Sequence, residues 1–315
     1  MLAIVLAAKS PPIMGVSSRA DSEPIILDRR RFLKQAFIGA VGVGAAVSVD
    51  GLLLEPHSLV AERVTIPLRN LPEAFHGFRI AVLGDLHFGP YVGKTQVERG
   101  VRLALSLKPD LTILTGDFVS HPLFVPNGPA GARHAEPCAE VLQQLNRSSL
   151  FAVLGNHDHW NEPDIVADAL HGHGLQVLRN QSVPLERDGQ RIWIVGVDDV
   201  YAGANDIDKA LRGVPSAETK IVAVHEPDFA DRVAKYPVDL QISGHSHGGQ
   251  VRIPGYGAPV LPHLGRKYSI GLNQVGGLQV YTNRGIGVVT PPVRLNCPPE
   301  VTLITLVGRA TPSAV

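Results

Sequence analysis

The residues that could do chemistry in this chain lie in five short segments, each at the end of an apolar run. They read, in order, Gly84-Asp85-Leu86-His87, Gly116-Asp117, Gly155-Asn156-His157-Asp158, His225 and Gly244-His245-Ser246-His247. Carboxylate oxygens, an amide oxygen and imidazole nitrogens, with no thiolate among them, suit Mn, Fe or Zn. A donor set of this size can hold two metal ions that together clamp a phosphoryl group. The pattern therefore predicts a centre that binds two divalent metal ions.

The spacing suggests which donor serves which metal. Asp85 and His87 are two residues apart where a strand ends, so both side chains can reach the first metal. Asp117 offers a carboxylate that can bridge two metals about 3.5–4 Å apart. The predicted metal ligands are Asp85, His87, Asp117, Asn156, His225, His245 and His247, with His247 returning to the first metal.

Three further residues are predicted to serve the reaction without binding a metal. A histidine side chain ordinarily titrates near neutral pH, so His157 could protonate the departing oxygen or hold a phosphoryl oxygen. Asp158 could orient that imidazole and favour its cationic form. The nucleophile would be a hydroxide made by the metals, which lower the pKa of bound water, so no serine or cysteine nucleophile is required. Arg284, in a glycine loop after a strand, could contact a phosphate.

The elements that must position these residues are strands alternating with helices. Apolar runs predict strands at 78–83, 111–115, 150–154, 175–178, 191–197, 220–224, 238–243, 279–282 and 301–306. Helical periodicity predicts helices at 94–107, 139–145 and 162–171. In such an α/β fold, ligands gather outside the carboxyl ends of the strands. Aspartate after a strand and a glycine is also common in turns, so one match would be weak evidence, but five in order are strong. The stretch 252–272, just after the last ligand, is predicted to be a loop that faces the substrate.

The N-terminus carries a second signal. Asp28-Arg29-Arg30-Arg31-Phe32-Leu33-Lys34 precedes a weakly apolar run rich in Ala and Gly, at 35–49. Paired arginines before such a run are typical of a twin-arginine export signal, which makes the twin-arginine export machinery an expected partner. The run is shorter than the about 20 apolar residues of a membrane-spanning helix. No sharp cleavage site follows it, so an uncleaved membrane anchor is the alternative. The protein is expected in the cell envelope, exported or anchored in the inner membrane.

Length and composition fit one large domain with an N-terminal extension. The chain has 315 residues, of which 44% are hydrophobic, enough to bury a full core. We expect an extension with the signal or anchor at 1–54, a linker at 55–77, the catalytic domain at 78–308 and a tail at 309–315. The net charge of 0 gives no electrostatic case for nucleic acid as a partner. Two distant cysteines exclude a disulfide scaffold.

The five segments match D-x-H, G-D, G-N-H-[D/E], H and G-H-x-H, and in this the chain resembles the calcineurin-like metallophosphoesterase superfamily. The resemblance covers residues 78–306 and implies a four-layer α/β/β/α sandwich with a dinuclear metal site at the carboxyl ends of the strands. The C-terminal segments Thr282-Asn283-Arg284-Gly285-Ile286-Gly287 and Asn296-Cys297-Pro298-Pro299-Glu300 resemble the membrane-associated or twin-arginine-exported phosphodiesterase branch. That branch includes enzymes similar to UDP-2,3-diacylglucosamine pyrophosphatases of lipid A synthesis.

These features predict a hydrolase that cleaves a phosphodiester or pyrophosphate bond with a metal-activated hydroxide. One expected substrate is a lipid-linked or nucleotide-sugar pyrophosphate of the UDP-2,3-diacylglucosamine type. The alternative is a general phosphodiester of the cell envelope. The two conflict on location, because cleavage of a lipid A precursor belongs on the cytoplasmic face and a twin-arginine signal delivers the domain outside. A third hypothesis is a non-catalytic homologue that keeps only the metal site.

Overall fold

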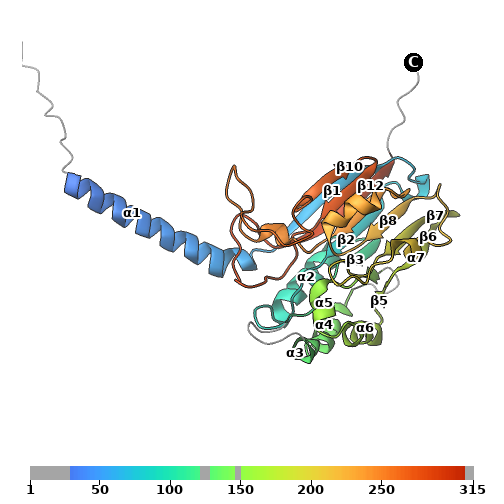
Figure 1. The fold of residues 1–315 in the computed structure, drawn as a ribbon, viewed down its shortest axis with the longest axis horizontal. Helices are drawn as coiled ribbons and strands as arrows, with labels where there is room; N and C mark the ends of the chain where they lie inside the picture. The colour runs from blue at the N-terminus through green and yellow to red at the C-terminus, as the bar shows by residue number, and fades with distance from the viewer. Residues whose placement is uncertain (1–28, 121–127, 146–149, 309–315) are drawn as a thin grey trace, which may run out of the picture. The chain divides into compact units, whose positions relative to one another are not determined.

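The computed structural model describes residues 29–120, 128–145 and 150–308. The chain divides into two units, residues 1–45 and 46–315. The predicted tail at 309–315 and the first 28 residues lie outside the described residues. Within the second unit, two six-stranded sheets carry most of the structure (Figure 1).

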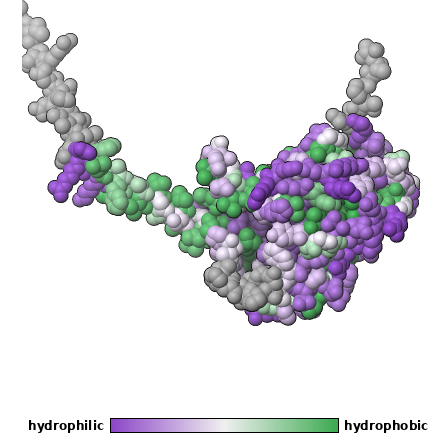
Figure 2. Space-filling model, in the orientation of Figure 1, coloured by the Kyte–Doolittle hydropathy of each residue, from purple (hydrophilic) through white to green (hydrophobic). Residues whose placement is uncertain are grey.

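The N-terminal helix α1, Arg29–Val49, buries none of its residues. Large apolar side chains such as Phe37 and Val43 are more than half exposed. Figure 2 shows this apolar surface along α1, with hydrophilic side chains gathered at its beginning. The helical stretch Arg29–His57 is long and apolar enough to cross a membrane, and a signal sequence would pass the same test. The run is thus longer than the sequence suggested, because the helix continues through Asp50 into a π-helical turn, η1 (Asp50–Leu54), and a 3₁₀ turn, η2 (Glu55–His57).

The first sheet contains the strands that carry the first three ligand segments. Its order is β1 (Val60–Leu68), β12 (Glu300–Gly308), β2 (Arg79–Leu83), β3 (Leu111–Leu114), β4 (Leu150–Ala152) and β5 (Gln176–Val177). From β2 to β5 the strands are parallel, so their carboxyl ends meet at one edge; β12 runs antiparallel to β2.

The second sheet carries the last two ligand segments. Its order is β10 (Gly271–Val275), β11 (Leu278–Thr282), β9 (Leu240–Ser243), β8 (Lys220–Ala223), β7 (Gln190–Gly196) and β6 (Gln181–Arg187). The four central strands are parallel, and the two edge strands, β10 and β6, are antiparallel to their neighbours.

Three hydrophobic cores stack these sheets and helices into four layers. The alternation along β2 shows how: Ala81 and Leu83 face one core, while Ile80 and Val82 face the next. The outer core joins the first sheet to α2 (Lys94–Ser106), α4 (Ala135–Leu142) and α6 (Pro163–Gly172). The middle core lies between the sheets, and the third joins the second sheet to α7 (Ile207–Ala210) and α8 (Ala230–Val233). The predicted α/β/β/α sandwich is confirmed.

Every predicted strand and helix is present, with ends that differ by a few residues, and further elements appear. The segment 55–77, predicted as a linker, contains β1, which pairs with β12 over nine residues, so that prediction is corrected. Its first half is exposed and carries Glu62 and Arg63, which hid the strand in the sequence. Two short helices, α3 (Pro129–Ala132) and α5 (Asn156–Trp160), were also not predicted.

Candidate metal centre

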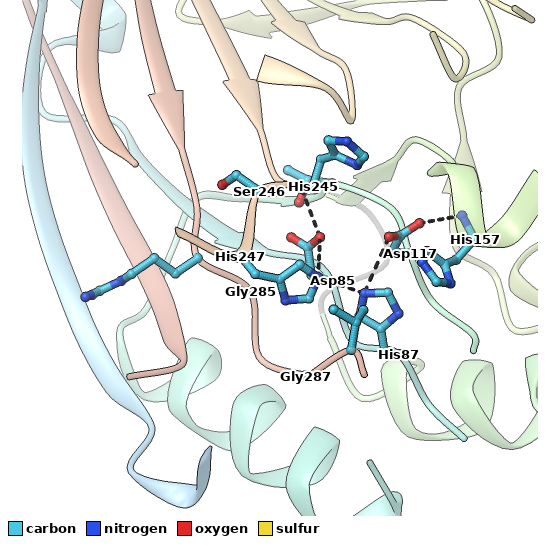
Figure 3. A network of polar contacts seen from close by, with 12 residues as sticks. Asp85, His87, Asp117, His157, His245, Ser246, His247, Gly285 and Gly287 are labelled. Atoms are coloured by element: carbon cyan, nitrogen blue, oxygen red, sulfur yellow. Dashed lines mark hydrogen bonds and ion pairs between the residues drawn. The ribbon is translucent and has the colours of Figure 1, made fainter. Parts of the chain in front are cut away.

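The predicted ligands converge where strands of the two sheets end. Asp85 and His87 follow β2, Asp117 follows β3 and Asn156 follows β4, while the remaining three histidines follow β8 and β9. Figure 3 shows Asp85, His87, Asp117 and His247 pointing toward one another, with His245 beside them. The structure therefore brings together residues that are up to 162 positions apart, from Asp85 to His247.

Four of these residues form the tightest cluster. Ligand atoms of Asp85, His87, Asp117 and His247 all lie within 4.8 Å of one another, and all four residues are buried. The Nε2 atoms of His87 and His247 are 2.9 Å apart. His247 Nε2 lies 3.4 Å from Asp85 Oδ1, and His87 Nε2 lies 3.4 Å from Asp117 Oδ2. Such spacings suit donor atoms that share one ion.

Asp117 also faces the second predicted group of ligands. Its Oδ2 atom lies 3.2 Å from His225 Nε2, and the ring of His225 is 5.0 Å from that of His245. One nitrogen of each of these two rings is hydrogen-bonded to a backbone carbonyl. His225 Nδ1 lies 2.7 Å from Thr115 O, and His245 Nε2 lies 2.7 Å from His263 O. This leaves His225 Nε2 and His245 Nδ1 as the ring nitrogens that could bind a metal. Asp117 is thus placed between the two groups, as a bridging carboxylate must be.

Five buried polar atoms of this set have no hydrogen-bond partner among the described residues. They are Asp85 Oδ2, His87 Nδ1, Asn156 Oδ1, His225 Nε2 and His247 Nδ1. A buried polar atom without a partner costs about 1–3 kcal/mol. Burial also raises the pKa of Asp85 to about 7, with His225 acting against that shift, and lowers the pKa of His87 and of His247. Cations would satisfy the Asp85 carboxylate, Asn156 Oδ1 and His225 Nε2, and would be bound by the Nε2 atoms of His87 and His247, which are the ring nitrogens that face the cluster. The residues present therefore fit a pair of divalent ions.

The backbone at the ligands is held in a conformation that side chains rarely adopt. Asp85, His87, Asp117, His245 and His247 all have positive φ, between 47° and 67°. A residue other than glycine pays about 1–2 kcal/mol for this region. Backbone bonds between the loops hold the conformation, with Asp85 N–H donating to Gly116 O and His87 N–H to Asp117 O, both at 2.9 Å. Strain of this kind marks functional sites.

Asp158 organises the loop that carries Asp117. Its Oδ2 atom accepts the N–H groups of Asp117 and Gly155, and its Oδ1 atom accepts those of Phe118 and Val119, at 2.8–3.2 Å. Its carboxylate is thus engaged by backbone, whereas the sequence suggested a bond to the ring of His157. The contact with that ring stays a prediction.

His157 stands between the metal ligands and the open part of the site. Its backbone N–H donates to Asp117 Oδ1 at 2.9 Å, and its ring packs edge-on against that of His87 with centroids 4.6 Å apart. Trp160 packs on its other side, at 4.7 Å. The ring therefore borders both the predicted ligands and a cavity.

That cavity has a volume of about 590 Å³ and is mostly apolar. Beside Asp117, Asn156, His157, His245 and His247, its wall includes Trp160, Tyr201, the segment from Gly249 to Val251, the segment from Pro259 to His263 and the segment around Val289 to Val293. The predicted loop 252–272 thus contributes to the wall, while the segment near Val289 was not predicted.

Arg284 is not brought to this cavity. Its guanidinium pairs with Glu300 and, at 3.3 Å, with Glu62, and its side chain is largely buried. The predicted phosphate contact of Arg284 is therefore corrected, because both carboxylates already engage the group.

Sequence reasoning missed Arg294, which supports the ligand Asp85 from behind. This arginine is fully buried and donates to the carbonyls of Arg284, Gly285, Gly287 and Cys297. The loop that it holds donates Gly287 N–H to Asp85 O at 2.7 Å. A side chain on Gly285 would overlap Asp85, so the loop packs directly on the ligand. Nothing in the spacing of Arg294 signals this role.

His159, which sequence reasoning left without a role, belongs to a second polar group beside the site. Its Nε2 atom lies 2.8 Å from Asp198 Oδ1, and Arg179 Nε donates to Asp198 Oδ2 at 2.8 Å. Burial lowers the pKa of His159, but the bond to Asp198 outweighs it and the net shift is upward.

Comparison with known proteins gives consistent matches. The model of the family described as calcineurin-like phosphoesterase matches residues 78–249. The uncharacterized metallophosphoesterase YkuE of Bacillus subtilis is 34% identical over 89% of this chain and 98% of its own length. The phosphodiesterase YaeI of Escherichia coli is 33% identical over 73% of this chain and 82% of its own. The UDP-2,3-diacylglucosamine pyrophosphatase LpxG of Chlamydia muridarum is 25% identical over 84% of this chain and 98% of its own.

Proposed function

The chain belongs to the calcineurin-like phosphoesterase family, and from this premise we propose that it hydrolyses a phosphodiester or pyrophosphate bond with two divalent metal ions. The observation that carries the proposal is the convergence of Asp85, His87, Asp117 and His247 within 4.8 Å, with His225 on the other side of Asp117. Buried donor atoms with no partner among the described residues support a cation at this point rather than a structural ion-pair network.

The proposed ligands are the seven predicted ones. Divalent ions held by such a set lower the pKa of water and polarise a phosphoryl group. Mn, Fe and Zn all accept this mixture of oxygen and imidazole donors. Asp117 would hold both ions, and the Asp158 carboxylate would keep Asp117 in place through the backbone N–H groups that it accepts.

His157 is the proposed proton donor. Its ring borders the cavity. Its backbone N–H donates to Asp117 Oδ1 at 2.9 Å, so the segment that carries the ring is bonded to the carboxylate proposed to bridge the ions. A protonated imidazole there would give its proton to the departing oxygen. Trp160 packs against the ring and limits the directions that it can take.

The first candidate substrate is a lipid-linked or nucleotide-sugar pyrophosphate. The mostly apolar cavity wall favours it, as does the similarity to LpxG, a UDP-2,3-diacylglucosamine pyrophosphatase in its own organism. The second candidate is a general phosphodiester of the cell envelope, favoured by the arginines that begin α1. An anchored protein with its domain inside the cell fits the first, and export through the twin-arginine machinery fits the second.

Hydrolysis by metal-stripped protein reloaded with Mn or Zn tests the proposal. The substrates are bis-p-nitrophenyl phosphate and UDP-2,3-diacylglucosamine, and the variants are Asp117→Asn and, as control, Asp168→Asn, an exposed aspartate on α6. We expect metal-dependent turnover that Asp117→Asn lowers at least 100-fold together with metal content, and that Asp168→Asn leaves unchanged. Strong turnover of the lipid nucleotide would select the first substrate. No turnover of either compound with either metal would contradict the proposal.

A further inference from the structure

One side of the cavity is built from apolar residues that the proposed hydrolysis does not use. Val251, Pro259, Val260, Leu261, Pro291 and Val293 line it, opposite the metal ligands and His157. The segment 258–261 lies directly over Gly249, where a side chain would meet Ala258 and Val260 O. Ligand sites in proteins are commonly apolar with a few polar groups, but a hydrolytic centre for a small charged diester does not require so long an apolar wall.

The outer end of this wall carries exposed apolar side chains. Ile253 and Gly257 exchange backbone hydrogen bonds at 2.9 Å, which closes a tight turn. Tyr256 at the tip of that turn is 74% exposed, Val260 is 76% exposed and Ile253 is 49% exposed. We call these three residues the apolar rim. Large apolar groups exposed together at the mouth of a cavity mark an interaction site.

Hydrogen bonds connect the residue before the rim, Arg252, to the strip 293–297, and connect that strip to the turns that follow the apolar N-terminal helix. Arg252 N–H donates to Leu295 O at 2.8 Å, and Asn296 Nδ2 donates to Arg252 O at 3.0 Å. The same strip, 293–297, is bound to the turns η1 and η2: Arg294 N–H donates to Gly51 O at 2.9 Å, and Asn296 N–H donates to Glu55 Oε2 at 2.8 Å. Rim and η1 therefore flank one strip of chain.

The η1 turn is itself apolar and exposed. Leu52, Leu53 and Leu54 are 48%, 63% and 57% exposed, and they continue the stretch Arg29–His57 that is apolar enough to enter a membrane. Exposed leucines at the end of such a stretch favour the boundary of a lipid layer. The rim would then lie near the same boundary, because Arg252, the residue before Ile253, and η1 both bond to the strip 293–297.

We propose that the apolar rim rests on a lipid surface, so that the cavity opens toward the membrane and takes a phosphodiester that carries an acyl or alkyl chain. The phosphate would reach the metal ligands, and the chain would lie along the wall from Val293 to Val260. This inference rests on the proposed hydrolysis and adds to it the class of substrate and the side from which the substrate enters. We infer that a membrane lipid, rather than a protein or a second copy of this chain, covers the apolar rim.

The test compares two p-nitrophenyl phosphodiesters with the same scissile bond. One carries a methyl group, and the other carries an octadecyl chain and is embedded in phosphatidylethanolamine–phosphatidylglycerol vesicles. The full chain, loaded with Mn, is reconstituted in those vesicles. The variant is Ile253→Asp, and its matched control is Ile165→Asp on α6, because both isoleucines are 49% exposed and neither lines the cavity.

Burial of each methylene is worth about fourfold in binding. We expect kcat/KM for the octadecyl ester to exceed that for the methyl ester at least tenfold. Ile253→Asp should lower the octadecyl value five- to tenfold and leave the methyl value within twofold, while Ile165→Asp changes neither. Equal values for the two esters, or equal effects of the two variants, would overturn the inference. Absence of metal-dependent hydrolysis of both esters, and of bis-p-nitrophenyl phosphate, would instead remove the proposed function on which it rests.

Discussion

Arg294 offers the sharpest test of how the fold supports the metal centre. Its guanidinium donates to four backbone carbonyls, with the shortest bonds at 2.6 Å to Gly287 O and 2.8 Å to Arg284 O. Lysine keeps the charge but presents its three donors from a single atom, so it cannot span all four carbonyls. The change Arg294→Lys therefore removes at least two bonds to a charged donor while leaving their acceptors buried.

The magnitude follows from those bonds. At about 1.5 kcal/mol for each lost bond to a charged group, Arg294→Lys should lower the free energy of unfolding by about 3 kcal/mol. The thermal midpoint should fall by about 6 °C, at about 2 °C per kcal/mol for a chain of this size. Because the loop that Arg294 holds packs on Asp85, the affinity for metal should also fall, by about 10- to 100-fold.

The assay is urea unfolding of the Mn-loaded protein together with Mn titration of the stripped protein. Arg102→Lys is the control, since that arginine is exposed and pairs with Glu98 on the same helix, at 3.6 Å. It should change the unfolding free energy by no more than about 0.5 kcal/mol. If Arg294→Lys matched this control in both stability and Mn affinity, the argument that a buried guanidinium supports Asp85 would be refuted.

Three further predictions concern single residues of the site. His157→Ala should lower kcat by about 10²–10⁴-fold while the bound metal, counted by mass spectrometry, stays at the wild-type level; a parallel loss of metal would make His157 a ligand instead. Gly244→Ala should abolish metal binding in calorimetry, because a Cβ there would overlap the Asp85 carboxylate, and unchanged binding would show that the loop can move aside. Burial and the neighbouring Glu226 carboxylate raise the pKa of Asp199 to about 8. Between about pH 4 and 8, Asp199 therefore carries a proton in the folded protein that it has lost in the unfolded chain. The wild type should then lose stability relative to Asp199→Asn as pH rises from about 4 to 8, by at most about 1.4 kcal/mol per unit, and parallel urea-unfolding curves over that range would contradict it.

The chemistry of the site was readable in the sequence because each ligand follows a strand directly. Asp85, Asp117 and Asn156 lie two, three and four residues beyond the ends of the strands β2, β3 and β4, and parallel strands bring their ends together without any further information. The same local logic predicted the central strands β3, β8 and β9, which are mostly apolar and buried throughout. The edge strands β1, β6 and β10 alternate with exposed polar residues, and only pairing with a neighbour makes them strands.

What supports the ligands was not readable, because it depends on contacts between distant segments. Arg294 acts on Asp85 across more than 200 residues, and no local pattern encodes its four carbonyl partners. Asp158 was predicted to act on a ring and instead accepts backbone N–H groups of the loop after β3. The apolar wall joins Val260 to Val293, and hydrophobicity alone does not say that two loops share a cavity.

The number of divalent ions bound per chain tests the central claim most directly. Metal-stripped protein would be reloaded with Mn, freed of excess ion and analysed for metal and protein, beside Asp117→Asn and the exposed control Asp168→Asn. The account predicts two ions per chain in the wild type and the control, and one or fewer in Asp117→Asn, because that carboxylate faces both groups of ligands. Full occupancy in Asp117→Asn, or a wild type that retains no ion, would contradict a two-metal centre bridged by Asp117.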